Sequence, residues 1–217
     1  MSPSLGTFTD QLADPQVYGA FGIHPHSAKF YNDALEQRIV AALAHPKAVA
    51  WGECGLDYHY KHSPPAQQRE VFARQIRMAV VHKKPLIVHS REAEKDTIEL
   101  LRTNMPLDWP VHIHCFNDSP EYLTELLAVF PKAFIGITGV VTFDDAKRLR
   151  DIVAKLLPLN RLLLETDAPY MAPRPAKGPS HPGHIPAIAQ CIADVKGVTV
   201  QEVMVAARQN TKTVYGI

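Results

Sequence analysis

The chain has 217 residues, a length that fits one α/β barrel domain, and we expect a single domain over residues 1–217. Hydrophobic residues make up 46% of the sequence and charged residues 21%, a composition that excludes a mainly disordered chain. The 23 Lys and Arg residues against 22 Asp and Glu give a net charge of +1, which excludes a protein that coats polyanions and limits any contact with nucleic acid to a local surface.

The cysteine and hydropathy patterns narrow the class of protein further. Three cysteines without a C-x-x-C motif argue against a disulfide scaffold and against a zinc finger, and they are typical of a reducing compartment. No stretch approaches the ~20 apolar residues of a membrane span. The sequence therefore predicts a soluble intracellular protein of the cytoplasm or nucleus, and we expect a monomer.

Short apolar runs alternate with amphipathic stretches along the chain. Helices are predicted by an apolar stripe around Phe72, by an N-cap followed by proline at Ser119-Pro120, and by a capping box that starts at Thr199. This alternation favours a parallel sheet covered by helices. Strands are predicted at Val17–His24, Ala48–Glu53, Leu86–His89, Val111–His114, Ala133–Thr138 and Leu162–Glu165.

The number of strand–helix units is smaller than a complete barrel requires. Six units are counted here, whereas a TIM-type barrel needs eight. Residues Ser2–Pro15 can supply one helix but carry no strand pattern. Two interpretations remain open: an open six-stranded sheet, or a barrel whose first two strand–helix units are missing.

Four predicted strands end in residue types that bind metal ions. Glutamate ends one strand at Glu53, histidines end two others at His89 and His114, and Glu165 and Asp167 follow the last. The carboxyl ends of parallel strands open on the same mouth, so these side chains should converge there. Each could instead be a hydrogen-bonded core group, but burying the whole set would be costly without a cation. Histidine and carboxylate together suit Zn²⁺, Mn²⁺ or a related divalent ion.

Four further polar residues lie near the same strand ends. His24 and His26 follow the first predicted strand, where His24 either points into the mouth or caps a loop. Arg91 lies two residues beyond His89 and could hold a phosphate, or could form a salt bridge to a neighbouring glutamate. His112 shares a strand face with His114.

Five short motifs together resemble the TatD family of metal-dependent deoxyribonucleases, and the eukaryotic TatD-domain branch in particular. The resemblance covers about Val17 to Tyr215, and it is specific because the motifs occur in order at suitable spacings. The motifs are Gly22-Ile-His-Pro-His26, Gly52-Glu-Cys-Gly-Leu-Asp57, His89-Ser-Arg91, His114-Cys-Phe116 and Glu165-Thr-Asp-Ala-Pro169.

The resemblance implies a TIM-type (β/α)8 metallo-hydrolase barrel, with its first two strand–helix units missing from this chain. It implies that Glu53 bridges two divalent ions (Mg²⁺, Mn²⁺ or Zn²⁺) and that His89 and His114 complete one metal position. Asp167 would serve the other ion and, with Glu165, position or deprotonate the attacking water. The catalytic set would then be Asp167, Glu165 and His24, with His24 near the scissile phosphate, and the substrate-binding set Arg91 and His26.

The implied reaction is hydrolysis of DNA phosphodiester bonds, typically from 3′ to 5′, on a single strand or a 3′ end. Two departures from the family stand out. A His-x-His pair expected on the family's first strand is absent before His24, so we expect one metal position to be incomplete and DNA cleavage to be weak. In the loop Arg174–Pro186, Ser180-His-Pro-Gly-His184 replaces an arginine-rich segment. The alternatives are a related metallo-hydrolase acting on other esters or amides, and an inactive or regulatory truncated barrel.

Overall fold

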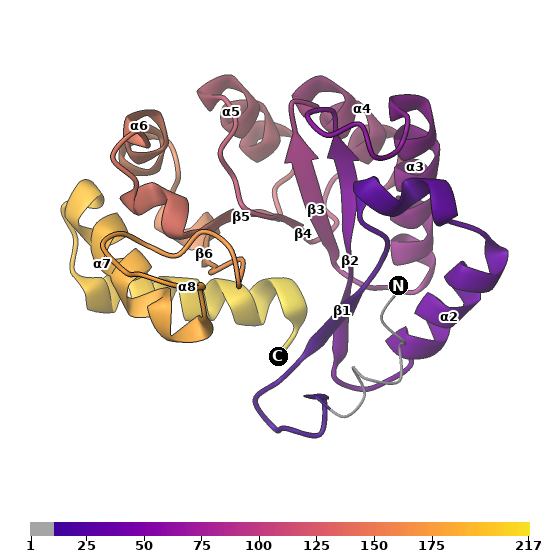
Figure 1. Ribbon diagram of the computed structural model, residues 1–217, viewed down its shortest axis with the longest axis horizontal. Coiled ribbons are helices and arrows are strands. Elements are labelled where there is room, and N and C mark those ends of the chain that lie inside the picture. Colours follow the sequence, from indigo (N-terminus) through magenta and orange to yellow (C-terminus); the bar gives the residue numbers. More distant parts are fainter. Residues whose placement is uncertain (1–10) are drawn as a thin grey trace. The chain divides into compact units, whose positions relative to one another are not determined.

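The computed structural model describes residues 11–217, in which strands and helices alternate within two compact units (Figure 1). One unit ends at Trp109 and the other begins at Pro110. Within each unit the strand pairings are parallel, as the sequence predicts. The single domain over residues 1–217 stays a prediction, and the possible helix in Ser2–Pro15 falls largely outside the described residues.

The first unit is built around a long central strand with parallel partners on both sides. Trp51 of this strand and Phe72 and Ile76 of the following helix are fully buried, so the predicted apolar stripe does face the core. The elements are β1 (Gly19–Phe21), the 3-10 helix η1 (Pro25–Phe30), α2 (Asp33–Leu43), β2 (Ala48–Asp57), α3 (Pro65–Val81), β3 (Leu86–Arg91) and α4 (Glu94–Asn104).

The strand β2 continues four residues beyond its predicted end at Glu53. Its pairing with β3 extends to Asp57, which lies opposite Arg91, so Asp57 occupies the carboxyl end of the strand. The register shifts between Trp51 and Cys54, which marks a bulge around Glu53. A bulge bends the strand locally, and this one lies at the residue whose carboxylate contacts His89. Alternation in the sequence does not reveal such a bulge.

The strand β1 is shorter than the predicted Val17–His24, because a side chain replaces its last ladder partners. Gln75 of α3 accepts a hydrogen bond from Ile23 N at 2.8 Å and donates one to Ile23 O at 3.0 Å. The same amide oxygen accepts a bond from the Trp51 indole at 3.2 Å. His24 follows directly and begins the turn into η1, so Gln75 fixes the backbone immediately before it.

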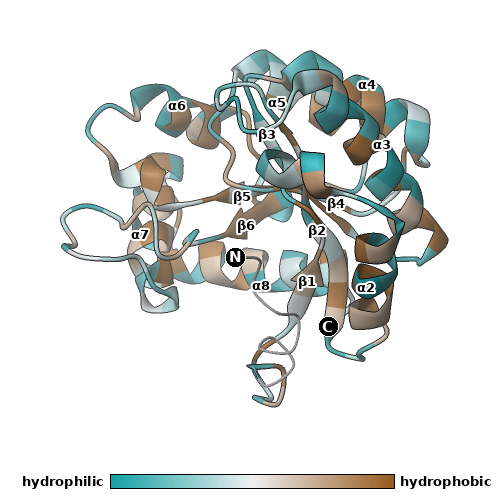
Figure 2. Cartoon of the chain, turned by 45° about the vertical axis from the view of Figure 1, so that its right-hand side comes forward, coloured by the Kyte–Doolittle hydropathy of each residue, from teal (hydrophilic) through white to brown (hydrophobic). Residues whose placement is uncertain are grey.

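The second unit has β5 paired in parallel with both β4 and β6, and the hydrophobic strand β6 is brown in Figure 2. Among the described residues of the chain, no helix is both long and apolar enough to cross a membrane. The elements are β4 (Val111–Ile113), α5 (Pro120–Val129), β5 (Ala133–Ile137), the 3-10 helices η2 (Gly139–Thr142), η3 (Leu159–Arg161) and η4 (Pro182–His184), α6 (Lys147–Lys155), β6 (Leu162–Leu164), α7 (Ile185–Lys196) and α8 (Val200–Tyr215).

The predicted helix starts in this unit are confirmed, and α8 is anchored at both ends. Ser119 caps α5 by accepting a bond from Tyr122 N at 3.1 Å. Thr199 and Glu202 form the predicted capping box of α8. Asn210, buried near the other end of α8, donates to the carbonyl of Leu162 at 2.8 Å. This bond ties α8 to β6 and places its last residues beside the strands.

The three strands of the second unit each end one residue earlier than predicted. His114, Thr138 and Glu165 are the residues that follow β4, β5 and β6. Thr138 caps η2, and the side chains of His114 and Glu165 are hydrogen-bonded to each other. The polar residue at each end therefore lies just beyond the ladder, where the chain turns away from the sheet.

We expect Gln75→Ala to destabilise the first unit, because it leaves the backbone of Ile23 and the indole of Trp51 without their buried partner. The loss should be about 2–4 kcal/mol of unfolding free energy, measured by urea denaturation. Gln67→Ala, on the same helix and only half-buried, should change stability by no more than about 0.5 kcal/mol. Equal losses in the two variants would contradict the role assigned to Gln75.

Candidate metal centre

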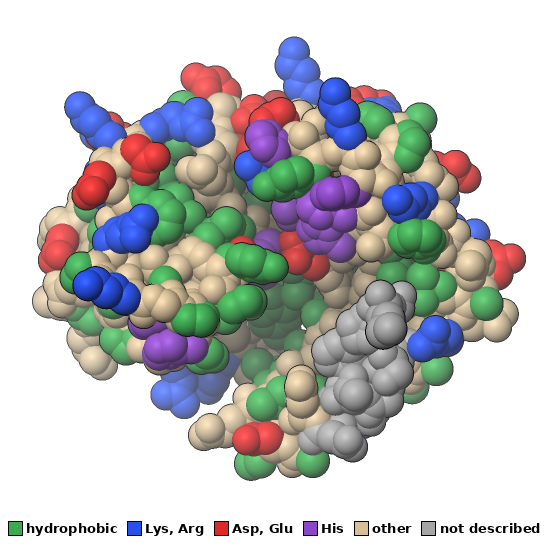
Figure 3. Space-filling model, viewed as in Figure 1, with side chains coloured by type: hydrophobic (Ala, Val, Ile, Leu, Met, Phe, Trp, Pro, Cys, Tyr) green, Lys and Arg blue, Asp and Glu red, His purple; other side chains and the backbone are tan. Residues whose placement is uncertain are grey.

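Three side chains of the first unit come together: His24, which follows β1, Glu53 within β2, and His89 within β3. Each of His24, Glu53 and His89 offers a ligand atom, and these atoms all lie within 4.8 Å of one another. His89 Nδ1 lies 2.9 Å from Glu53 Oε1, and His24 Nε2 lies 3.4 Å from His89 Nδ1. Histidine side chains gather in one patch on the face shown in Figure 3. The spacing is that of a group able to hold one metal ion.

A buried carboxylate at the end of β2 orients this group. Asp57 is 1% exposed, and its Oδ2 lies 3.1 Å from His89 Nε2 and 2.9 Å from His26 Nε2. Its Oδ1 accepts a bond from Tyr60 N at 2.9 Å. Burial alone would raise the pKa of Asp57, but the bonds to His89, Tyr60 and His26 hold it well below the ordinary value. Asp57 is thus an acceptor, and His89 donates from Nε2.

With Nε2 of His89 donating to Asp57, its Nδ1 faces two groups, Glu53 Oε1 at 2.9 Å and His24 Nε2 at 3.4 Å. Nδ1 presents either a lone pair or a second proton to the Glu53 carboxylate at 2.9 Å. Burial lowers the pKa of His89, but Asp57 and Glu53 raise it above the ordinary value. A metal ion between Nδ1 and Glu53 would take the place of that second proton. The donor atoms therefore fit a divalent ion. Asp57 holds the His89 ring in position through its contact with Nε2.

His24 fits a different role from that of its two neighbours. Its Nδ1 accepts a bond from His26 N at 3.2 Å, so the neutral ring carries its proton on Nε2. Burial and the neighbouring His89 lower the pKa of His24 to about 4, and the ring is neutral at physiological pH. A protonated Nε2 is a hydrogen-bond donor and not a metal ligand. His24 therefore caps the start of the loop. Its Nε2–H points toward His89 and Glu53.

In the second unit, Glu165 holds His114 in place. Its Oε1 lies 2.8 Å from His114 Nδ1, and its Oε2 accepts a bond from Cys115 N at 2.8 Å. His114 Nε2 then faces Asp167 Oδ1 at 3.4 Å. Burial raises the pKa of the Cys115 thiol to about 12, which leaves it protonated and unsuited to bind metal. His114 Nε2 and Asp167 are the pair that fits an ion here.

A second histidine of the same strand contains an unsatisfied buried atom. His112 Nδ1 is bonded to the Tyr215 hydroxyl at 2.6 Å, at the end of α8. His112 Nε2 lies 2.8 Å from Glu165 Oε1, yet it makes no hydrogen bond of acceptable geometry. His112, His114 and Glu165 form the other group whose ligand atoms lie within 4.8 Å. His112 and His114 thus both lie against one carboxylate, each with a ring nitrogen 2.8 Å from Glu165 Oε1.

The close approach of Glu165 and His112 requires glycine on the neighbouring strand. A β-carbon on Gly136 would overlap Glu165 Oε2 and would lie 2.6 Å from His112 Nε2. Burial would raise the pKa of Glu165, but His112 and His114 hold it well below its ordinary value. The buried carboxylate is therefore ionised, and the glycine provides the space it occupies.

The structure brings the predicted site residues together in two groups, one in each unit. Glu53, His89 and His24 lie together in the first, with His26 attached through Asp57; His114, Glu165 and Asp167 lie together in the second. The convergence of all four expected ligands, Glu53, His89, His114 and Asp167, stays a prediction. Arg91 lies over the Tyr60 ring at 4.9 Å, while Glu92 is paired with His59 at 2.7 Å.

Five residues that the sequence did not single out as site residues support the two groups. Asp57 is bonded to the His89 ring, Gln75 and Gln68 hold the backbone of Ile23 and Asp57, and Tyr215 is bonded to His112, which lies 2.8 Å from Glu165. For Gln68 and Gln75 the sequence carried a signal: they are seven residues apart, which places both amides on the core-facing side of α3. The five are Asp57, Gln68, Gln75, His112 and Tyr215.

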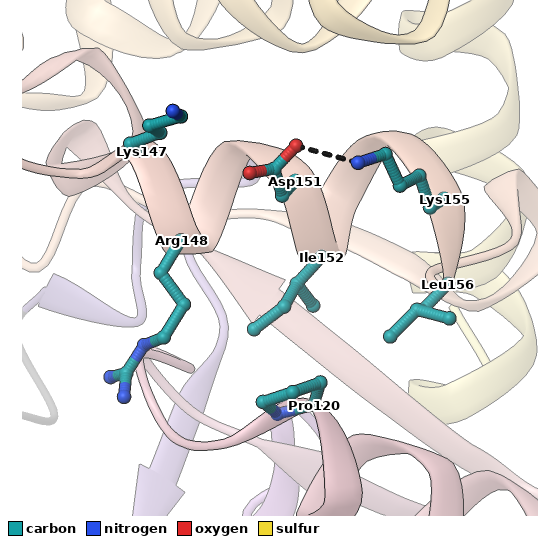
Figure 4. A pocket seen from close by; sticks show the side chains of 7 residues that line it. All are labelled: Pro120, Lys147, Arg148, Asp151, Ile152, Lys155 and Leu156. Carbon is teal, nitrogen blue, oxygen red and sulfur yellow. Dashed lines mark hydrogen bonds and ion pairs between the residues drawn. The ribbon is translucent and has the colours of Figure 1, made fainter.

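A separate pocket in the second unit has no part in either group. It lies against α6 and the start of α5, where Asp151 is paired with Lys155 at 2.9 Å (Figure 4). Its cationic residues are Lys147, Arg148 and Lys155. None of the residues that line it can bind metal together with the histidines described above.

Parallel strand–helix units with histidines and carboxylates beyond the strand ends define an α/β protein with a candidate metal centre. Residues 7–216 match the TatD related DNase family, and the chain belongs to this family. In the crystal structure of YjjV, a TatD homologue from Escherichia coli K12, the matched part covers 98% of this chain and 82% of that chain, with 26% identity and a TM-score of 0.89. The TatD barrel fold class predicted from the motifs is confirmed.

Sequence relatives lie in animals and bacteria. The human 3′-5′ RNA nuclease TATDN2 is 41% identical over 211 residues, which are 95% of this chain but 28% of the human protein. The metal-dependent hydrolase YabD of Bacillus subtilis is 35% identical over 93% of this chain and 78% of its own length. The 3′-5′ ssDNA/RNA exonuclease TatD of Escherichia fergusonii is 34% identical over 94% of this chain and 79% of its own length.

We expect Asp57→Asn to weaken binding of a divalent ion by the first unit, because the amide no longer holds the His89 ring through a charged acceptor. The affinity for Mn²⁺ or Zn²⁺, measured by isothermal titration calorimetry, should fall by about 10- to 100-fold. Asp96→Asn is the matched control: it removes a carboxylate paired with Arg69 and Tyr58, apart from the metal group. Equal affinities in Asp57→Asn and the unaltered chain would contradict this role.

Gly136→Ala should destabilise the second unit by about 1–3 kcal/mol, because the added methyl group overlaps the Glu165 carboxylate. The measurement is urea denaturation of the variant beside Glu165→Ala and the double variant. If the overlap is the cause, the double variant will be more stable than the sum of the two single losses predicts. Strict additivity would show that Gly136 acts on another part of the unit.

Proposed function

We propose that the chain hydrolyses phosphodiester bonds of single-stranded nucleic acid, proceeding from the 3′ end, with the help of divalent metal ions. The observation that carries this proposal is a carboxylate hydrogen-bonded to a histidine ring in each unit: Asp57 to His89, and Glu165 to His114. This device orients metal ligands in many hydrolytic sites. The names of the human and Escherichia fergusonii relatives support the substrate class.

Two ion positions are proposed, with Mg²⁺, Mn²⁺ or Zn²⁺ as the ions. Glu53 and His89 would hold one ion and His114 and Asp167 the other, whereas the family resemblance assigns His89 and His114 to the same ion. When bound, such ions lower the pKa of a water molecule and neutralise charge on a phosphate. The part of the protein is to fix the ligands and to place donors and acceptors around the substrate.

His24 is proposed to donate a hydrogen bond to a phosphate oxygen. Its proton lies on Nε2 because Nδ1 accepts from the backbone of His26, and burial keeps the ring neutral. A neutral donor adds no charge that would repel a metal ion beside it. The side chain is 32% exposed, so a substrate can reach the ring.

Asp167 is proposed to accept the proton of the attacking water, with Glu165 as a positioning residue. The Asp167 side chain is 28% exposed, whereas that of Glu165 is 11% exposed and has His114 and the Cys115 backbone as partners. A carboxylate with both oxygens engaged is poorly placed to receive a proton from water. This division of roles is narrower than the family resemblance implies, since the resemblance gives both residues a part in handling the water.

The test is degradation of 3′-labelled single strands of DNA and of RNA by the 217-residue chain with Mg²⁺, Mn²⁺ or Zn²⁺. Because one metal position is expected to be incomplete, we expect weak cleavage from the 3′ end, which EDTA abolishes and which Asp167→Asn reduces by about 10²-fold or more. Asp151→Asn, an exposed carboxylate on α6, is the matched control and should leave the rate unchanged. Metal content by mass spectrometry should accompany each assay.

Two outcomes would overturn the proposal. Hydrolysis of amide or simple ester substrates, with neither nucleic acid degraded, would favour a related metallo-hydrolase activity. Degradation that persists at full rate in Asp167→Asn would exclude the proposed role of that carboxylate and the metal position that it helps to form.

A further inference from the structure

The loop that follows β2 presents an aromatic and cationic surface beside the metal group of the first unit. The Tyr60 and His62 rings are nearly parallel, with centroids 5.6 Å apart and planes at 21°. The Arg91 guanidinium lies over the Tyr60 ring at 4.9 Å from its centroid. We call Tyr60, His62 and Arg91 the stacking platform.

The platform is exposed and its backbone is fixed. All three side chains are exposed, and that of Tyr60 retains 43% of its surface. The Tyr60 backbone N–H donates to buried Asp57, and the following Ser63 is buried and bonded to His26 O at 2.9 Å. A core role does not explain exposed rings held on so rigid a backbone. Exposed aromatic side chains on a fixed backbone are suited to bind a flat ligand.

The platform continues into the metal group through His26. The His26 ring meets Tyr60 edge to face at 5.2 Å and His62 at 4.7 Å. It also meets the His24 ring at 4.3 Å, and His24 lies 4.6 Å from His89. A ligand stacked on the platform would therefore have its neighbouring groups next to the ligands of the metal ion, all within one unit.

We infer that the platform binds a nucleobase of the single-stranded substrate by stacking, with Arg91 beside the phosphate of the same nucleotide. This inference rests on the proposed function. Every nucleobase has a flat π face, so the platform would hold a terminal nucleotide without reading its sequence. The combination of aromatic rings and one arginine next to a metal group matches a nucleotide in shape and charge, and neither feature alone would do so.

The probe is a short phosphorothioate DNA strand, which resists hydrolysis, carrying fluorescent 2-aminopurine at its 3′ end. A second strand has an abasic 3′-terminal position. We expect the full chain to quench the 2-aminopurine and to bind the base-bearing strand about tenfold more tightly than the abasic one, by fluorescence anisotropy. Tyr60→Ala and His62→Ala should remove this difference, while Tyr60→Phe should retain it because the ring remains.

Tyr18→Ala is the matched control, because Tyr18 is 45% exposed in the same unit and also lies near a cation, Lys47, but not beside the metal group. It should leave the base-dependent difference unchanged. The inference is overturned if Tyr60→Ala keeps the full difference, or if the unaltered chain binds abasic and base-bearing strands equally. Cleavage is scored separately: base-dependent binding without hydrolysis contradicts the proposed function alone, and hydrolysis without base-dependent binding contradicts the platform alone.

Discussion

The geometry of the first unit depends on one buried carboxylate, Asp57, and on its bonds to two imidazoles and a backbone amide. Asp57 is 1% exposed, so its charge is stabilised by His26, His89 and Tyr60 N in place of water. Gln68 fixes the backbone of Asp57 through both its N–H and its carbonyl. The Asp57 carboxylate is therefore held in one orientation. Because it contacts His89 Nε2, it also fixes the orientation of the His89 ring.

The sequence was sufficient to predict the strands and several helix starts because these depend on local patterns. Runs of Val, Ile and Leu mark buried parallel strands wherever they occur, and the Thr199 capping box uses residues three apart in the chain. The same reasoning placed Glu53 and His89 near each other on neighbouring strands, and their separation of 2.9 Å agrees with it, although both lie inside their strands and not at the ends. Local sequence patterns therefore predicted which residues could be ligands. They did not predict which atoms of these residues lie opposite one another.

The supporting contacts could not be predicted, because each joins residues far apart in the sequence. Tyr215 reaches His112 from 103 residues away, and Gln75 replaces the ladder partners of Ile23 from 52 residues away. The space for Glu165 beside Gly136 likewise depends on the register of two strands. Glycine, glutamine and tyrosine have many structural uses, so their residue types alone indicate none of these roles.

The charge balance of the first group explains why a divalent cation suits it better than protons. Glu53 and Asp57 both lie against His89, at 2.9 and 3.1 Å, and bring two carboxylates to one ring. His24 does not compensate them, since its pKa of about 4 keeps it neutral. Of the two carboxylates, Asp57 also has His26 Nε2 at 2.9 Å. Glu53 Oε1, 2.9 Å from Nδ1 of His89, is therefore the carboxylate oxygen that an ion of charge +2 beside a neutral His89 would meet most directly.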